Sequence, residues 1–88
     1  QKRCDIVAYR LKQDISIGAN LKKYRNKAGL SQEAVAAKLQ TMGLDIIREI
    51  ISQMELGQYN IRVSVLLALT EIYDTPIQNF FEDLERYE

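Results

Sequence analysis

The chain has 88 residues, which allows one domain with one modest core. It contains no histidine and a single cysteine, so an internal disulfide and a Cys/His zinc site are both excluded. We therefore expect the protein to be located in the reducing cytoplasm. Net charge is zero, but residues 1–60 carry ten Lys and Arg against six Asp and Glu, and residues 61–88 carry two against six. This polarity would orient a small protein on a polyanion, although two ordinary solvated surfaces give the same count.

An N-terminal arm precedes the first clear periodicity. The apolar residues within 1–15 fit neither a helical nor a strand period, so the arm is predicted to be extended, helical, or ordered only against a partner. A first helix is predicted over about 17–27, with Ser16 as candidate N-cap and Gly29 as the stop. Its inward stripe has residues spaced four, three and four apart: Ile17, Leu21, Tyr24 and Ala28.

A second helix is predicted to begin after Ser31, which is a good N-cap residue, and to stop at Gly43. Its predicted inner face consists of Val35, Ala36 and Leu39. A third helix is predicted over about 48–56, ahead of Gly57, and a fourth over about 63–73.

A fifth helix is predicted after Thr75 and Pro76, a cap followed by proline at the first helical position. Its apolar residues are Ile77, Phe80, Phe81 and Leu84. The whole pattern predicts an all-α bundle of five helices over 16–81, between the arm (1–15) and an acidic tail (82–88).

The third predicted helix separates its apolar and polar residues. At about 100° per residue, one half of the wheel carries Ile47, Ile50, Ile51 and Met54, and the other carries Arg48, Glu49, Ser52 and Gln53. An apolar back with a polar face bearing Arg and Gln suits the DNA major groove, because Arg pairs with guanine and Gln with adenine. An ordinary amphipathic surface helix has the same pattern, so this helix alone does not decide the function.

Two charged residues lie at the edges of inward stripes. Arg25 is about 40° from Leu21 on the first helix, and Glu55 is about 40° from Ile51 on the third. A half-buried charge needs an opposite charge, so we expect Arg25 and Glu55 to form a structural ion pair between these helices.

The order of these features resembles the Cro/cI-type repressors, the XRE-like helix-turn-helix family. The resemblance covers residues 16–81 and depends on Gly29-Leu30-Ser31-Gln32 followed by Ser52-Gln53-Met54-Glu55-Leu56-Gly57. It implies a lambda-repressor-like bundle whose third helix reads the major groove. Under this resemblance Arg48, Glu49 and Gln53 would read base edges, and Arg25 and Glu55 match the family's internal ion pair. Contacts to the DNA backbone are expected from Ser31, Gln32, Asn60 and Arg62.

The chain departs from the family pattern in three places. The stretch from Leu39 to Ile51 is several residues longer, so 40–45 should extend the second helix or bulge the turn. Ile47 stands where Ser or Thr usually begins the third helix, and the loop 58–62 has only Arg62 as a cation. Fewer phosphate contacts would make binding weaker and less sensitive to salt.

We therefore expect a sequence-specific, repressor-like bacterial transcriptional regulator that binds duplex DNA in the cytoplasm as a homodimer. Adjacent Phe80 and Phe81 cannot both face inward, so one of them is a candidate dimer contact, as are the apolar residues of the arm. The alternative is a protein-interaction or antitoxin-type module on the same fold, which Glu49 and the weakly basic loop favour. An enzyme is not expected, because Cys4 has no evident base and no phosphate-binding glycine motif occurs; nor are a metal, cofactor, membrane span or small-molecule substrate.

Overall fold

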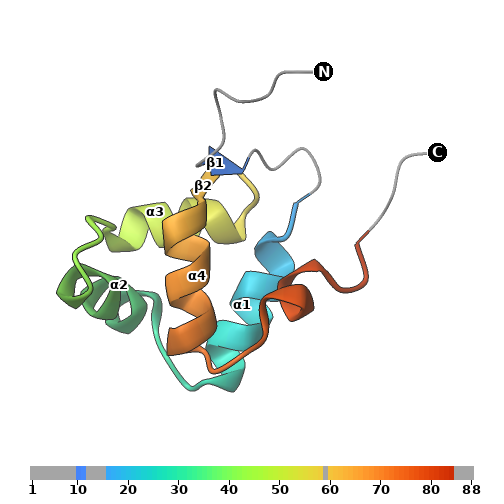
Figure 1. The fold of residues 1–88 in the computed structure, drawn as a ribbon, viewed down its shortest axis with the longest axis horizontal. Helices are drawn as coiled ribbons and strands as arrows, with labels where there is room; N and C mark the ends of the chain where they lie inside the picture. The colour runs from blue at the N-terminus through green and yellow to red at the C-terminus, as the bar shows by residue number, and fades with distance from the viewer. Residues whose placement is uncertain (1–9, 12–15, 59, 85–88) are drawn as a thin grey trace.

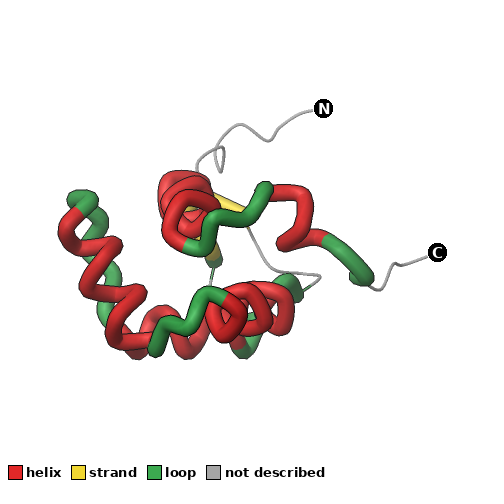
Figure 2. The backbone as a smooth tube through the Cα atoms, turned by 90° about the horizontal axis from the view of Figure 1, so that it is seen from below, coloured by secondary structure: helices red, strands yellow, loops and turns green. Residues whose placement is uncertain are grey.

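The computed structural model describes residues 10–11, 16–58 and 60–84 of the chain. Its elements in chain order are β1 (Arg10–Leu11), α1 (Gly18–Lys27), α2 (Gln32–Thr41), α3 (Arg48–Glu55), β2 (Ile61–Arg62), α4 (Val63–Ile72) and the 3₁₀ helix η2 (Ile77–Phe81). In Figure 1, α2 lies on one side of α4, and α1 and η2 lie on the other. Figure 2 shows that short loops join these helices. The all-helical bundle predicted from the sequence is confirmed, with four α-helices in the described part of the chain in place of five.

The predicted fifth helix is a 3₁₀ helix of five residues. Its N-cap is Pro76, which directly precedes it with an extended backbone (φ −61°, ψ 146°), and not Thr75, whose hydroxyl instead donates a hydrogen bond to the carbonyl oxygen of Tyr73 at 3.0 Å. After the helix, Asp83 turns the chain with a positive φ of 56°. A segment bounded so closely on both sides is too short to become a full α-helix, and 3₁₀ geometry is common in such short pieces.

A two-stranded antiparallel sheet was not predicted. It pairs Arg10 with Arg62 and Leu11 with Ile61. Of the three predicted states of the arm, the extended one is therefore correct for residues 10–11, while residues 1–9 and 12–15 lie outside the described part. Strands of two residues show no recognisable alternation in a sequence, and the sequence pattern predicts a loop at Ile61–Arg62.

The core is one cluster to which all four α-helices and η2 contribute. Its largest fully buried side chains are Phe80, Leu21, Leu39, Ile46, Ile51, Met54, Ile61, Leu66, Leu69, Val35 and Val65. The predicted inner faces of the first two helices are confirmed except at Ala28, which is the C-cap of α1 and is exposed. Within the described residues, no helix is long and apolar enough to cross a membrane.

The beginning of α1 packs backbone against backbone on the end of α3. A Cβ atom at Gly18 would overlap the carbonyl oxygen of Glu55 and lie 2.7 Å from that of Met54, so only glycine allows this approach. The predicted cap Ser16 is one residue further from the helix than expected, since Ile17 is the N-cap. Its hydroxyl still accepts a hydrogen bond from the Gly18 N–H at 3.0 Å, so it still satisfies one free donor of the first turn.

Candidate nucleic-acid interface

Helix α3 has one buried face and one exposed face. Ile51, Met54 and Glu55 are buried, whereas Arg48, Glu49 and Gln53 are exposed and Ser52 is half-buried. The predicted separation of the polar residues from the apolar ones is confirmed for the helix proper. The three predicted base-reading side chains therefore share the solvent face of one short helix, where an incoming duplex can reach them.

Ile47 does not lie with the other apolar residues of this helix. It is the N-cap of α3, with an extended backbone (φ −101°, ψ 167°), and its side chain is 48 % exposed. The prediction that it faces inward was wrong, because the helical period was extended one residue beyond the start of the helix. A residue with extended dihedrals does not follow the 100° rotation.

The α2–α3 turn accommodates the longer spacing seen in the sequence. Helix α2 ends at Thr41, so residues 42–47 form a longer turn rather than further helix. Gly43 has a positive φ of 85°, a conformation that glycine adopts readily. The turn is fixed at its far end by Ile46, which is 2 % exposed and whose carbonyl oxygen accepts a hydrogen bond from Gln40 at 3.0 Å.

The predicted ion pair between α1 and α3 is confirmed. Arg25 Nε donates to Glu55 Oε2 at 2.6 Å and Nη2 donates to Oε1 at 3.1 Å, with side chains only 10 % and 4 % exposed. The guanidinium also donates to the Leu30 carbonyl oxygen at 2.9 Å. The hydrogen bonds from Arg25 to Glu55 raise the pKa of Arg25, which offsets the opposite effect of burial. The pair therefore ties α1, the α1–α2 loop and α3 together behind the exposed polar face.

Gln32 connects the first residue of α2 to this ion pair. Its Nε2 donates to Glu55 Oε1 at 3.0 Å, a contact that sequence reasoning missed. An amide NH₂ carries two hydrogens, so one of them remains for a second acceptor. Glu55 thus orients the side chain that the resemblance assigns to the DNA backbone.

The other predicted backbone contacts lie at the two ends of the same region. Ser31 caps α2, and its hydroxyl oxygen accepts from the Ala34 N–H at 3.0 Å. Asn60 is exposed and Arg62 is half-buried, on the segment that leads from α3 into α4. The free N–H groups at the start of a helix carry partial positive charge, which makes the beginning of α2 a favourable neighbour for a phosphate.

Two ion pairs join lysine or arginine side chains outside the core to carboxylates. On α3, Arg48 Nη2 lies 3.2 Å from Glu49 Oε2, and both side chains are well exposed. On α1, Lys23 Nζ lies 2.6 Å from Glu82 Oε2, which also accepts from the Tyr24 hydroxyl at 2.7 Å. The hydrogen bonds from Lys23 and Tyr24 lower the pKa of Glu82, and the bond to Glu82 raises the pKa of Lys23.

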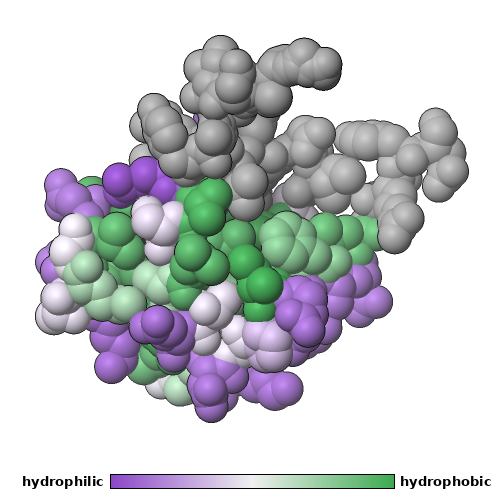
Figure 3. Space-filling model, viewed as in Figure 1, coloured by the Kyte–Doolittle hydropathy of each residue, from purple (hydrophilic) through white to green (hydrophobic). Residues whose placement is uncertain are grey.

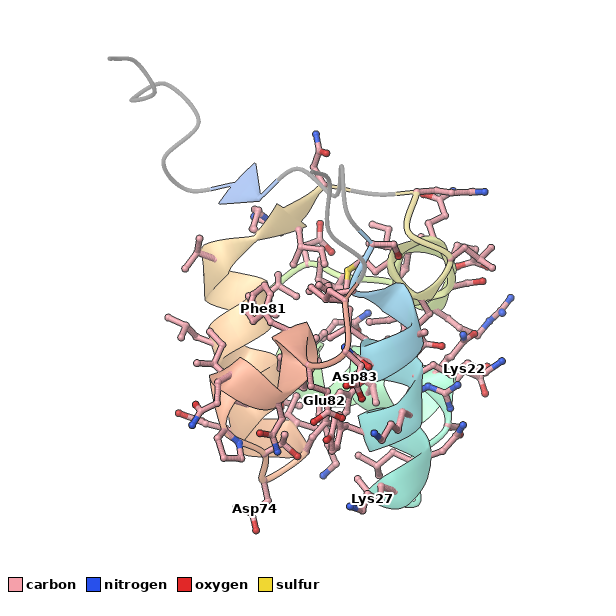
Figure 4. All side chains as sticks on the ribbon, turned by 90° about the vertical axis from the view of Figure 1, so that its right-hand side faces the viewer. Lys22, Lys27, Asp74, Phe81, Glu82 and Asp83 are labelled. Carbon is pink, nitrogen blue, oxygen red and sulfur yellow. The ribbon has the colours of Figure 1, made fainter. Side chains whose placement is uncertain are left out.

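Glu82, which the sequence placed in an acidic tail, is thus attached to α1. Asn20 reinforces this attachment, because its Nδ2 donates to the carbonyl oxygens of Phe80 at 2.9 Å and of Glu82 at 2.8 Å. In Figure 4, Glu82 and Asp83 lie between η2 and α1. Among the described residues, no cluster of three or more His, Cys, Asp or Glu could hold a metal ion.

Comparison with known proteins gives a consistent result. The helix-turn-helix family profile matches residues 21–80, more than half of the chain. The HTH-type transcriptional regulator PrpR of Mycobacterium tuberculosis is 39 % identical over 66 residues, which cover 75 % of this chain; the chain spans only 13 % of that protein's length.

Two solved structures are similar in fold and sequence. The restriction-modification controller protein C.AhdI from Aeromonas hydrophila superposes with a TM-score of 0.63 at 31 % identity, covering 74 % of this chain and 87 % of that one. The DNA-binding domain of BldD superposes with a TM-score of 0.61 at 28 % identity, with the same two coverages. The chain therefore belongs to the Cro/cI (XRE) type of the helix-turn-helix family.

Proposed function

We propose that residues 16–81 bind duplex DNA sequence-specifically by placing α3 in the major groove, with residues 1–15 as an arm and 82–88 as a tail whose first residue, Glu82, is held on α1. The observation that supports this most directly is the exposed polar face of α3, where Arg48, Glu49 and Gln53 meet solvent opposite a buried apolar back. Arg48 suits guanine, Gln53 suits adenine, and the Glu49 carboxylate suits the amino group of cytosine. The Arg48–Glu49 pair must open for this, which costs little because exposed ion pairs contribute roughly 0–1 kcal/mol.

The DNA backbone would be held on either side of α3. Gln32 supports this assignment because one amide hydrogen is held by Glu55 and the other is available to a phosphate oxygen. Ser31, Asn60 and Arg62 are the remaining proposed contacts. Since Arg62 is the only cation among the four, we expect modest affinity and a shallow dependence on salt.

The test begins with selection of binding sequences from a random DNA library, followed by fluorescence anisotropy on the selected duplex. Arg48→Ala should weaken binding about 5- to 150-fold, the fold-change of one lost bidentate base contact, and relax the preference at one base position. Lys27→Ala is the matched control. It also removes a cation, but Lys27 lies beside the Tyr24 ring and lines the hollow formed with Tyr73. Equal binding of wild type and Arg48→Ala to all duplexes would refute the role of α3.

We further propose that the protein acts as a repressor-like homodimer in the bacterial cytoplasm; its similarity to a bacterial transcriptional regulator supports the regulatory part of this proposal. An apolar surface on α4 and η2, made of Leu67, Ile77 and Phe81, offers a dimer contact, and these side chains are 52 %, 37 % and 42 % exposed. Figure 3 shows hydrophobic residues gathered over this side of the molecule. Light scattering at tens of micromolar, on wild type and on Leu67→Ser, would show a dimer that the variant weakens.

A protein-interaction module is the second candidate function. It is supported by Glu49, whose carboxylate contacts Arg48 in the middle of the proposed reading face. This negative charge lowers the net positive charge of the face. Failure to enrich any DNA sequence in the selection, with a correctly folded protein, would favour this candidate.

A further inference from the structure

The first residue of the recognition region is an exposed isoleucine. Ile47 caps α3 and is 48 % exposed, although its neighbour Ile46 is 2 % exposed in the core. An N-cap side chain normally accepts a hydrogen bond from the first turn of its helix, and replacing such a residue by an apolar one destabilises the helix. Isoleucine has no acceptor, so neither packing nor capping explains it here.

The direction of Ile47 is set by a well-fixed backbone. The carbonyl oxygen of Ile46 is held by Gln40 at 3.0 Å, and the Leu44 N–H donates to the Leu39 carbonyl oxygen at 3.0 Å. The carbonyl oxygen of Ile47 itself accepts from the N–H groups of Ile50 at 3.0 Å and Ile51 at 3.3 Å. With both of its peptide groups held, Ile47 presents its methyl groups at the entrance of α3, directly before Arg48.

We propose that Ile47 is a specificity-determining residue that recognises thymine by packing against its 5-methyl group. This inference rests on the proposed major-groove function of α3. The N-terminal residues of a recognition helix are the ones that reach base edges. In the major groove, thymine alone presents a methyl group, and apolar side chains discriminate it by contact. Arg48, Glu49 and Gln53 present polar groups, so Ile47 adds an apolar contact to the proposed reading residues.

The test uses the 88-residue chain and the duplex obtained by selection. Each thymine is replaced in turn by uracil, which lacks only the 5-methyl group, and the replacement is made in both half-sites of a symmetric duplex. At one position next to that read by Arg48, wild type should lose roughly 4-fold in affinity for each half-site, the worth of one buried methyl-sized group, and therefore about 15-fold for a dimer that fills both half-sites.

Two variants connect that loss to Ile47. Ile47→Ala should bind the duplex with thymine and the duplex with uracil at that position with equal affinity, and its response to uracil at all other positions should be that of wild type. Alanine, like isoleucine, has no acceptor for an N-cap hydrogen bond, so the variant and wild type lack the same cap. Leu56→Ala is the control at the opposite end of α3, where Leu56 is 66 % exposed, and it should keep the wild-type profile. Circular dichroism confirms that each variant is folded.

Other outcomes overturn the inference in distinguishable ways. If the duplex is bound but no thymine shows a loss, or if the loss persists in Ile47→Ala, the role of Ile47 is wrong and the proposed DNA binding stands. If selection with folded wild-type protein enriches no sequence, the proposed function fails and this inference fails with it.

Discussion

Breaking the buried ion pair on one side should destabilise the fold far more than removing both partners. Glu55→Leu leaves the Arg25 guanidinium buried beside Leu30 without its carboxylate, and it also removes the acceptor of Gln32. Arg25→Leu leaves the reverse situation, a buried carboxylate whose remaining side-chain donor is the Gln32 amide. The double variant replaces both charges by apolar side chains of roughly comparable volume, although leucine is shorter than arginine.

The expected magnitude follows from burial. With side chains only 10 % and 4 % exposed, solvent screening is small, and loss of one partner from such a pair typically costs about 3–5 kcal/mol. For a domain of this size each kcal/mol lowers Tm by about 4–8 °C, so either single variant should lose roughly 12 °C or more. Replacement of a whole buried pair by apolar residues is often neutral or stabilising, so the double variant should lie near wild type or above it.

Urea unfolding followed by circular dichroism would measure all four proteins of this double-mutant cycle. If the pair is coupled, the double variant loses several kcal/mol less stability than the sum of the losses in the two single variants. Additive losses, with the double variant as unstable as the sum of the singles, would show that Arg25 and Glu55 contribute independently and would contradict the burial argument.

Three further predictions concern packing, pH and capping. Gly18→Ala should destabilise by about 1–3 kcal/mol in urea unfolding, since its Cβ overlaps the Glu55 carbonyl oxygen, whereas the exposed Asn26→Ala should be near neutral. Because the pKa of Glu82 is lowered in the folded protein, its ion pair stabilises the fold above the ordinary value of 4.5, and this contribution disappears as the pH falls through the lowered pKa. Glu82→Gln should therefore have a lower Tm than wild type at pH 7. A difference in Tm that persists well below pH 4.5 would contradict this prediction. Ile47→Ser should raise stability by about 0.5–2 kcal/mol through a new cap while losing discrimination of thymine, so lower stability would refute the capping argument.

The features predicted correctly depend on residues close in sequence or on a strong chemical requirement. Ser31 caps α2 because a serine before a helix-forming run has a donor three residues away, whatever the rest of the chain does. The Arg25–Glu55 pair was predictable because two charges on inward stripes have few alternatives to meeting each other. The need for an N-cap acceptor and the need for a buried charge to have a partner can both be recognised in the sequence without knowing the conformation of the loops between the helices.

The features that the sequence did not predict depend on contacts between distant segments and on where the helices end. The β1–β2 pair joins segments some fifty residues apart through two residues each, and the attachment of Glu82 to α1 joins segments nearly sixty apart. Neither leaves a periodic pattern, since each uses single side chains or a few backbone groups. The boundaries of η2 and the exposure of Ala28 and Ile47 follow from helix ends, which periodicity places only to within a few residues.

The error at Ile47 is the most informative of these, because two chemical rules fail there together. An apolar residue ought to be buried and an N-cap ought to accept a hydrogen bond, yet Ile47 does neither, while Ile46 and Gln40 hold the backbone on which it stands. Local rules of this kind are broken in folded proteins chiefly where another function compensates for the lost stability. On α3 the proposed DNA supplies that compensation: an exposed arginine, glutamate and glutamine on a fixed helix would meet the edges of bases, and an exposed isoleucine at the entrance to that helix would meet a methyl group.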